Sequence, residues 1–355
     1  MKIPRWPRPG SGQKTKRLAG LALADDAWRW VSEGRVEQEA LQASWVVNGL
    51  VQDFDPVAAA LQRLMDRLKA TTPAARLPTR VAMGLPSAAV LLHRTPVPPH
   101  LSETALLAWC HQQAAAWLPL PLADMVLDVY LEDPPSQTPS AWVGATRLER
   151  VQQVVSLAEA AGLTVCVLET ESCAYRRAVH QRVWGTGVLP ESVAGLALCL
   201  LAEESTQVQF VRLDSSGCAL MEERSLAWGR RHWTPPSGSP PSPTQTPSGW
   251  CLPEVLQAVL MGFWAGQGLA PSFLGDDTAA NPSVAVLLSG RLPGWIMALA
   301  PTARVSGMTG VLVQVFNPWL QNDALGLPPG APLEAPSFTV AWGLAQPCAL
   351  LPTGR

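Results

Sequence analysis

Residues 117–128 read Trp117-Leu118-Pro119-Leu120-Pro121-Leu122-Ala123-Asp124-Met125-Val126-Leu127-Asp128. Proline has no backbone N–H and is excluded from helix interiors and central strands, so the two prolines mark the exit from one element and the approach to the next. The segment lies in the middle of residues 80–178, where short apolar runs alternate with two capped amphipathic stretches. This alternation predicts a small α+β unit.

Two helices and five strands are predicted in this unit. Ser102 is a suitable amino-terminal cap for the first helix. Thr146 with Glu149 forms a capping box for the second, and Gly162 stands where a left-handed end residue belongs. The strand-like runs cover residues 80–85, 90–95, 126–131, 141–145 and 163–168. The order ββαββαβ over residues 80–168 therefore predicts both helices on one face of one sheet.

The composition restricts the class of protein. The chain has 355 residues, 48% hydrophobic and 15% charged, so it can bury a large core and is long enough for two lobes. A formal net charge of −2 gives no basis for nucleic-acid binding. Seven cysteines without C-x-x-C spacing argue against a disulfide framework or a zinc site and indicate reduced thiols. With 15 Trp and few charges, some apolar surface is expected to face a partner.

Both the amino terminus and one internal segment have biased composition. Residues 1–17 hold six basic residues and no acid, which predicts a disordered basic tail. Residues 18–24 imitate the core of a signal peptide, but the strand-like pattern continues through Trp28 and Trp30, so a first strand is favoured. Residues 234–249 consist almost wholly of Pro, Ser, Thr and Gly and predict a linker. The apolar runs are far shorter than the roughly 20 residues of a bilayer span.

Several short motifs resemble, in order, those of the PilM family of type IV pilus assembly proteins, which are relatives of the cell-division protein FtsA. The resemblance covers most of the chain and is carried by Gly84-Leu85-Pro86-Ser87-Ala88-Ala89-Val90, Leu118-Pro119-Leu120-Pro121, Val126-Leu127-Asp128-Val129, Ala160-Ala161-Gly162-Leu163, Glu169-Thr170-Glu171, Leu287-Leu288-Ser289-Gly290-Arg291-Leu292-Pro293-Gly294, Phe316-Asn317-Pro318 and Ala341-Trp342-Gly343-Leu344-Ala345. It implies an α/β, actin-like (ribonuclease H-like) two-lobed fold with the ββαββαβ unit inserted as a subdomain.

This fold implies six divisions of the chain. They are the basic tail (1–17), the amino-terminal part of the first lobe (18–79), the inserted docking subdomain (80–168), the rest of the first lobe with the start of the second (169–233), the linker (234–249), and the second lobe with the return to the first (250–355).

The three nucleotide loops of an actin-like ATPase are degenerate in this chain. The first phosphate loop resembles residues 20–26, with Gly20, Ala22 and Ala24 at its key positions, and the second resembles residues 200–204, with Leu200 and Ala202. The adenosine loop is reduced to Ser289-Gly290. Apolar residues replace the acids linked to magnesium, while two carboxylates in each turn would repel a triphosphate. We therefore expect no cofactor, with ATP and magnesium bound only if the functional loops lie at another register.

Other catalytic or metal chemistry has little support. The five histidines lack metal-ligand spacing, and no G-x-S-x-G or Walker-type motif occurs. The acid pair Glu169 and Glu171 is interpreted as solvated strand or turn acids, and Trp109 with Trp117 as core. No catalytic residue and no metal site is predicted, and the chain is not expected to be an enzyme.

The resemblance implies a binding function. PilM-like proteins lie on the cytoplasmic face of the inner membrane and bind the amino-terminal peptide of a PilN-like bitopic membrane protein beside the inserted subdomain. We place part of that groove at Leu118, Pro119, Leu120, Pro121 and Leu122; the alternative is that these residues form only a rigid connection. Self-association into a ring is a further expectation. The alternatives are an active actin-like ATPase, a cytoplasmic component of a type II secretion platform, and a periplasmic protein with a cleaved amino terminus.

Overall fold

The computed structural model describes residues 18–32, 35–74, 76–98, 101–131, 140–183, 193–214, 217–233, 253–267, 284–290, 292, 311–316, 337 and 339–346. The predicted basic tail (1–17) and linker (234–249) lie outside these residues, as do Asn317, Pro318, Pro293 and Gly294 of the family motifs.

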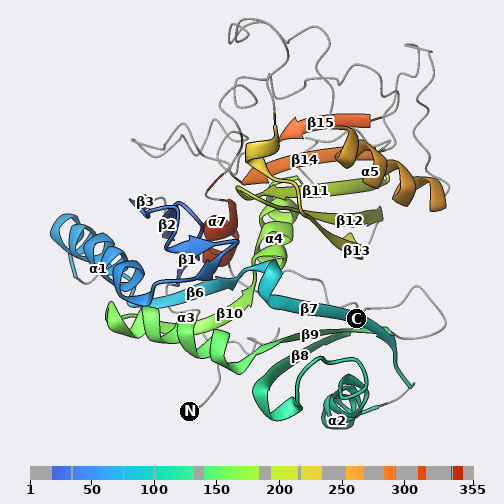
Figure 1. The fold of residues 1–355 in the computed structure, drawn as a ribbon, viewed down its shortest axis with the longest axis horizontal. Helices are drawn as coiled ribbons and strands as arrows, with labels where there is room; N and C mark the ends of the chain where they lie inside the picture. Colours follow the sequence, from blue (N-terminus) through green and yellow to red (C-terminus); the bar gives the residue numbers. More distant parts are fainter. Residues whose placement is uncertain are drawn as a thin grey trace, which may run out of the picture.

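The first lobe is built on a five-stranded sheet with the order β10-β6-β1-β2-β3 (Figure 1). Strands β1 (Ala19–Leu23), β2 (Ala27–Ser32) and β3 (Arg35–Ala40) form an antiparallel meander. Strands β6 (Arg80–Leu85) and β10 (Thr164–Thr170) extend the sheet parallel to β1. Every residue of β1 and β2 is buried, because both faces of the sheet are covered. The expected first strand is therefore confirmed.

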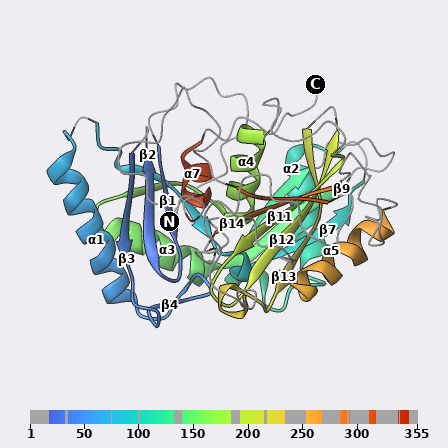
Figure 2. The same ribbon diagram turned by 90° about the horizontal axis from the view of Figure 1, so that it is seen from above.

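Helices cover both faces of this sheet (Figures 1 and 2). Helices α1 (Phe54–Thr71) and α3 (Leu148–Ala160) pack on the outer face. Helices α4 (Glu171–Val183) and α7 (Thr339–Ala345) pack on the face turned toward the second lobe. The buried side chains of α1 recur at the three- and four-residue spacing of an amphipathic helix: Val57, Ala60, Leu61, Leu64, Met65 and Leu68.

Helices α4 and α7 form a layer shared by the two sheets. A Cβ atom added to Gly20 of β1 would lie 1.8 Å from the Ala341 carbonyl oxygen, so the backbone of α7 touches that of β1 and only glycine fits. Arg177 of α4 donates a hydrogen bond to the Gly343 carbonyl of α7 over 2.9 Å. The hydroxyl of Tyr175 in α4 donates to the Leu287 carbonyl of the second sheet over 2.9 Å.

The second lobe repeats the strand order of the first. Its sheet runs β13-β12-β11-β14-β15, again with three antiparallel strands followed by two parallel to the first of them. The strands are β11 (Gly195–Leu201), β12 (Thr206–Asp214), β13 (Gly217–Leu226), β14 (Val284–Gly290) and β15 (Val311–Val315). Helix α5 (Glu254–Gly266) covers the outer face with Leu256, Leu260, Phe263 and Trp264.

The inserted subdomain is smaller than predicted. The order ββαββαβ is correct over residues 80–168, but the elements do not form one sheet, because β6 and β10 pair in the first main sheet and α3 packs on it beside α1. The separate unit runs from the short helix η1 (Ser87–Ala89) to the end of β9. It contains β7 (Val90–Pro96), α2 (Glu103–Ala114), β8 (Met125–Leu131) and β9 (Ser140–Arg147), with the strand order β7-β9-β8.

The predicted helix ends are partly confirmed. The Ser102 hydroxyl accepts a hydrogen bond from the Ala105 N–H over 3.3 Å, and Gly162 has a φ of 74° after α3. The capping box of Thr146 and Glu149 is absent from α3, whose cap position is Arg147. The Thr146 hydroxyl instead donates to the Ala89 carbonyl over 2.7 Å and ties β9 to the turn before β7. A tertiary hydrogen bond has replaced the local one.

Candidate functional site

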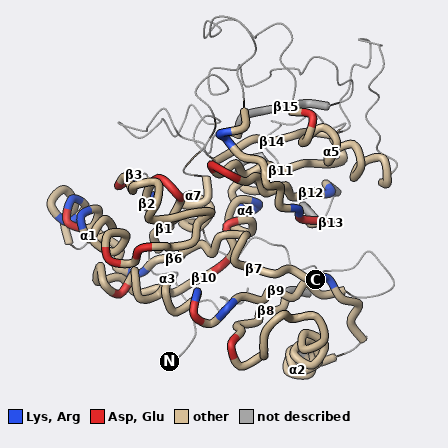
Figure 3. Tube along the Cα trace, viewed as in Figure 1, with Lys and Arg blue, Asp and Glu red and all other residues tan. Residues whose placement is uncertain are grey.

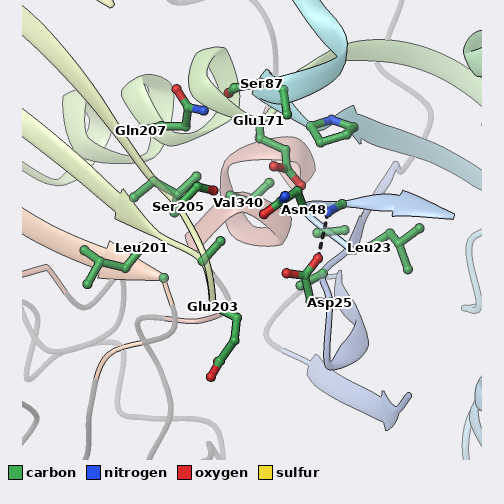
Figure 4. A pocket seen from close by; sticks show the side chains of 18 of the residues that line it. Leu23, Asp25, Asn48, Ser87, Glu171, Leu201, Glu203, Ser205, Gln207 and Val340 are labelled. Carbon is green, nitrogen blue, oxygen red and sulfur yellow. Dashed lines mark hydrogen bonds between the residues drawn. The ribbon is translucent and has the colours of Figure 1, made fainter. Parts of the chain in front are cut away.

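Three element ends meet at a cavity between the two lobes (Figure 4). The end of β1 and the turn after it contribute residues 22–26, the end of β11 and the turn after it contribute residues 200–203, and β14 ends there with Gly290. The turn between β4 (Val46–Val47) and β5 (Leu50–Val51), the η1 helix and the first residue of α4 add to the lining. The remaining lining residues are Arg29, Pro86, Ser205, Gln207, Ser337 and Val340.

Five of the seven predicted loop positions line this cavity: Ala22, Ala24, Leu200, Ala202 and Gly290. The other two do not. Gly20 lies under α7, and the buried Ser289 hydroxyl shares a 2.6 Å hydrogen bond with the Thr339 hydroxyl. Most of the positions that the family resemblance assigns to the three loops therefore lie at one cavity. Gly20 and Ser289 instead contact α7.

The cavity is small. Its volume is about 90 Å³, whereas small-molecule sites occupy roughly 300–1,000 Å³. Backbone fills the space where two of the loops converge: Gly290 has a φ of 88°, and a Cβ atom there would lie 2.3 Å from the Leu201 carbonyl oxygen. As lined by the described residues, the cavity is therefore well below the usual size of a small-molecule site.

A carboxylate of the protein occupies the first turn. Asp25 Oδ1 accepts a hydrogen bond from the backbone N–H of Gly49 over 2.7 Å, drawn as the dashed line in Figure 4. Asn48 and Gly49 have φ angles of 52° and 73° and form the two-residue turn between β4 and β5. A backbone amide that could face an anionic ligand is therefore bonded to a side chain of the protein itself.

Glu171, the first residue of α4, points into the same cavity (Figure 4). The pKa of its carboxyl is raised to about 8, chiefly by burial and also by the nearby Asp25 carboxylate, while Arg29 opposes this shift. Two acidic side chains from opposite walls thus lie close enough to influence each other's ionisation. With a pKa of about 8, the Glu171 carboxyl is largely protonated at neutral pH, so the cavity repels an anionic ligand more strongly once the pH rises above about 8.

The other acids of the two turns are paired with arginines. Asp26 forms an ion pair with Arg29 over 2.9 Å, Glu203 contacts Arg230 over 3.5 Å, and Glu204 contacts Arg231. The predicted repulsion from two carboxylates in each turn is therefore reduced by these neighbours. Elsewhere, acidic and basic residues are interspersed over both lobes (Figure 3).

Sequence reasoning missed Asn48, Gly49 and Glu171 as parts of this site. The dipeptide Asn48-Gly49 between two Val- and Leu-containing pairs is a strong hairpin signal that could have located the turn. The interpretation of Glu169 and Glu171 as solvated acids is wrong. Glu169 is 1% exposed and forms an ion pair with Arg177, while Glu171 faces the cavity. Glu169 lies near the end of β10, Glu171 follows that strand as the first residue of α4, and the packing of α4 encloses both acids.

The predicted partner segment, Leu118–Leu122, connects α2 to the short helix η2 (Leu122–Asp124). Its three leucines are partly buried, and Pro119 and Pro121 are exposed. Trp117, just before it, stacks on His93 of β7 with ring centroids 4.7 Å apart and packs with Trp109 against the core of the subdomain. The interpretation of both tryptophans as core residues is confirmed.

Two further features concern the described residues alone. The described residues contain no group of three His, Cys, Asp or Glu side chains placed to hold a metal ion. Their helices include none long and apolar enough to cross a bilayer.

Comparison with solved structures identifies similar folds. The chain is similar to a structure described as the PilM–PilN type IV pilus biogenesis complex, with a TM-score of 0.65 and 18% identity over 93% of this chain and 98% of that chain. Weaker similarity links it to the cytoplasmic domain of EpsL, an inner-membrane component of the type II secretion system of Vibrio cholerae (TM-score 0.40, 10% identity, 78% and 84% covered). Ethanolamine utilization protein EutJ from Carboxydothermus hydrogenoformans gives a TM-score of 0.41 at 13% identity, with 96% and 90% covered.

Sequence comparison gives a narrower result. No curated protein sequence matches the chain. The family model described as type IV pilus assembly protein PilM matches residues 23–215, more than half of the chain. The matched span contains the β1–β2 turn, the inserted subdomain, the shared helix α4 and the turn after β11. The expected α/β, actin-like fold of two lobes is confirmed, and the chain belongs to the PilM family of type IV pilus assembly proteins.

Proposed function

We propose that this protein is a cytoplasmic scaffold of the type IV pilus assembly machinery that binds the amino-terminal peptide of a PilN-like membrane protein and hydrolyses no nucleotide. The observation that carries the second part is the interlobe cavity of about 90 Å³, in which Asp25 is bonded to the Gly49 amide. Family membership and the fold shared with a PilM–PilN complex support the first part.

The chemistry of the cavity disfavours a magnesium–triphosphate complex. Magnesium is bound through carboxylates and water, yet Ala22 and Leu200 stand where the family places its metal-linked acids. The acids that line the cavity include Asp25 and Glu171, besides Asp26 and Glu203, which are paired with arginines. A ligand would have to displace the Asp25–Gly49 hydrogen bond and then accept two neighbouring carboxyl groups.

The proposed partner contact lies on the inserted subdomain at Leu118–Leu122. The partly buried leucines offer apolar surface, and neither Pro119 nor Pro121 can donate a backbone hydrogen bond. A tethered partner needs only modest intrinsic affinity, because the membrane holds its peptide at a high effective concentration. The scaffold would be peripheral to the inner membrane through this partner, and repetition of the contact would favour a ring.

Two titrations of the full-length protein test the proposal. A fluorescent ATP analogue with magnesium should show no saturable binding up to about 1 mM, and a synthetic peptide of the first residues of the PilN-type protein from the same organism should bind. Micromolar binding of the analogue would overturn the nucleotide-free scaffold in favour of an ATPase. Absence of peptide binding would overturn the partner assignment.

A further inference from the structure

A buried polar cluster lies where α4 packs against β12 and β13 of the second lobe (Figure 1). Side chains alternate along β12, so that Val208 and Phe210 pack beneath α5 while Gln209 faces α4. Gln209 is 1% exposed, and its Nε2 donates a hydrogen bond to the Ser172 carbonyl over 2.9 Å. Glu223 of β13 pairs with Gln209 in the strand register and therefore lies beside it on the same face.

The Glu223 carboxyl connects the second lobe to two places in the rest of the molecule. Burial raises its pKa, while the charge of Arg176 and hydrogen bonds from the Ser172 and Ser87 hydroxyls lower it. Ser172 is in the first turn of α4 and is 1% exposed, and its Oγ lies 3.4 Å from that of Ser87. Ser87 belongs to η1, at the base of the inserted subdomain. One acid of β13 is thus bonded both to α4 and to the start of the inserted subdomain.

Arg176 brings a positive charge to the same place. It lies four residues after Ser172, and so on the same side of α4, and it is 8% exposed. Three buried side-chain atoms of the cluster have no hydrogen-bond partner among the described residues: Arg176 Nη1, Gln209 Oε1 and Glu223 Oε2. Turning the Gln209 amide round does not change this, because only its NH2 group can donate to the Ser172 carbonyl. The cluster therefore presents one unpaired donor and two unpaired acceptors.

Three such atoms at one place indicate a common ligand. A buried polar group without a partner destabilises the fold, so native structures satisfy these groups with protein atoms or with ordered water. A metal cation would be repelled by Arg176, and an anion by Glu223. A water molecule can accept one hydrogen bond and donate two, and buried waters typically make about three hydrogen bonds. Water therefore matches the donor and the two acceptors of the cluster.

We propose that Arg176, Gln209 and Glu223 form a buried binding site for one water molecule that joins the second lobe to α4. The water accepts a hydrogen bond from Arg176 Nη1 and donates to Gln209 Oε1 and Glu223 Oε2. Because Glu223 also accepts a hydrogen bond from Ser87, the bound water fixes the carboxyl that holds the base of the inserted subdomain. The site is independent of the proposed function, since it involves neither the partner nor a nucleotide.

A direct ion pair is the competing arrangement. A rotation of the Arg176 side chain would bring Nη1 onto Glu223 Oε2 without water, and Gln209 Oε1 would then remain unpaired. The two arrangements differ in whether Gln209 interacts with Arg176. It does so through a shared water, and it does not in the ion pair. A double-mutant cycle between these two residues therefore tells the arrangements apart.

The first test is a crystal structure of the full-length wild-type protein. We expect an ordered water within about 2.7–3.2 Å of all three atoms. Direct contact between Arg176 and Glu223, with no water between them, would overturn the proposal. This measurement decides the matter even if a variant fails to fold.

The second test is the cycle of Arg176→Met and Gln209→Leu, measured by urea unfolding. Loss of either residue already deprives the water of one hydrogen bond. The increase in the unfolding equilibrium constant of the double variant should therefore be about fivefold or more below the product of the two single increases. Additive effects would overturn the shared water. The matched control, Arg177→Met with Gln209→Leu, should be additive, because Arg177 bonds to Glu169 and Gly343 instead.

Discussion

Asp25 accepts a hydrogen bond from the Gly49 amide over 2.7 Å, so the turn after β1 is closed by the chain's own carboxylate. Phosphate loops work because backbone N–H groups converge on an anionic ligand. Here the amide of a neighbouring hairpin is bonded to an aspartate within the protein. Asp25 therefore links the turn after β1 to the turn between β4 and β5.

Gly49→Ala should destabilise the protein by roughly 1–3 kcal/mol. Gly49 has a φ of 73°, and an added Cβ atom would lie 2.5 Å from Pro86 Cβ, so the substitution strains both the turn and its contact. Urea unfolding followed by tryptophan fluorescence measures the change. Gly262→Ala in α5 is the control, because its Cβ atom would meet nothing within 4 Å and should be neutral or stabilising. Equal effects at both positions would contradict the role of Gly49.

Glu171→Gln should make stability less sensitive to pH. A carboxyl whose pKa rises from 4.5 to about 8 on folding contributes stability that is present below pH 4.5 and lost as pH rises toward 8. One pKa unit corresponds to about 1.4 kcal/mol. Solvent screening at this partly exposed carboxyl reduces the expected loss to roughly 2 kcal/mol. The free energy of unfolding, measured from pH 4.5 to 8.5, should vary less with pH in Glu171→Gln than in the wild type. The control Glu159→Gln, at an exposed position on α3, should keep the wild-type pH dependence.

Arg177→Met should cost about 3–5 kcal/mol, because it leaves the buried Glu169 carboxylate without its ion-pair partner. It also removes the 2.9 Å hydrogen bond to the Gly343 carbonyl that joins α4 to α7. The double variant Glu169→Leu with Arg177→Met should recover much of the loss, since a buried ion pair is often replaceable by apolar residues. A double-mutant cycle measured by chemical denaturation gives the coupling energy between Glu169 and Arg177. Additive losses of stability would contradict an interaction between the two side chains.

Leu120→Asp should weaken binding of the PilN-type peptide about tenfold or more, because it places a charge in the apolar surface proposed for the partner. Ala123→Asp, at an exposed position in the adjoining helix η2, is the matched control. Isothermal titration at constant pH compares the two. Unchanged affinity for Leu120→Asp, with the unfolding midpoint preserved, would leave Leu118–Leu122 as a rigid connection only.

Much of the fold could be predicted because its signals are local. The Ser102 cap, the φ of Gly162 and the order ββαββαβ all agree with the structure. The capping box at Thr146 failed because its hydroxyl bonds to Ala89, which is 57 residues away in the chain. Local propensity could not reveal a competing partner at that distance.

Sequence reasoning located only part of the candidate site. The turns at Ala22–Ala24 and Leu200–Ala202 could be matched to family loops, but the hairpin at Asn48 and Gly49 has no counterpart in those motifs. Glu171 was assigned to solvent because its burial depends on how α4 packs between two sheets. The pair of Asp25 and Glu171 joins the turn after β1 to the start of α4, two places in the first lobe that are far apart in the sequence.

The sequence by itself determined the order of the elements over residues 80–168, the Ser102 cap and the helix end at Gly162, because these depend on residue types within a few positions of one another. Tertiary structure alone decided that β6 and β10 leave the inserted unit for the main sheet, that two sheets share one strand order without a sequence repeat, and that Gly49 closes over Asp25. Strand pairing and the burial of charge are set by contacts between distant segments. A local pattern specifies which face of an element is apolar, but not which partner covers it.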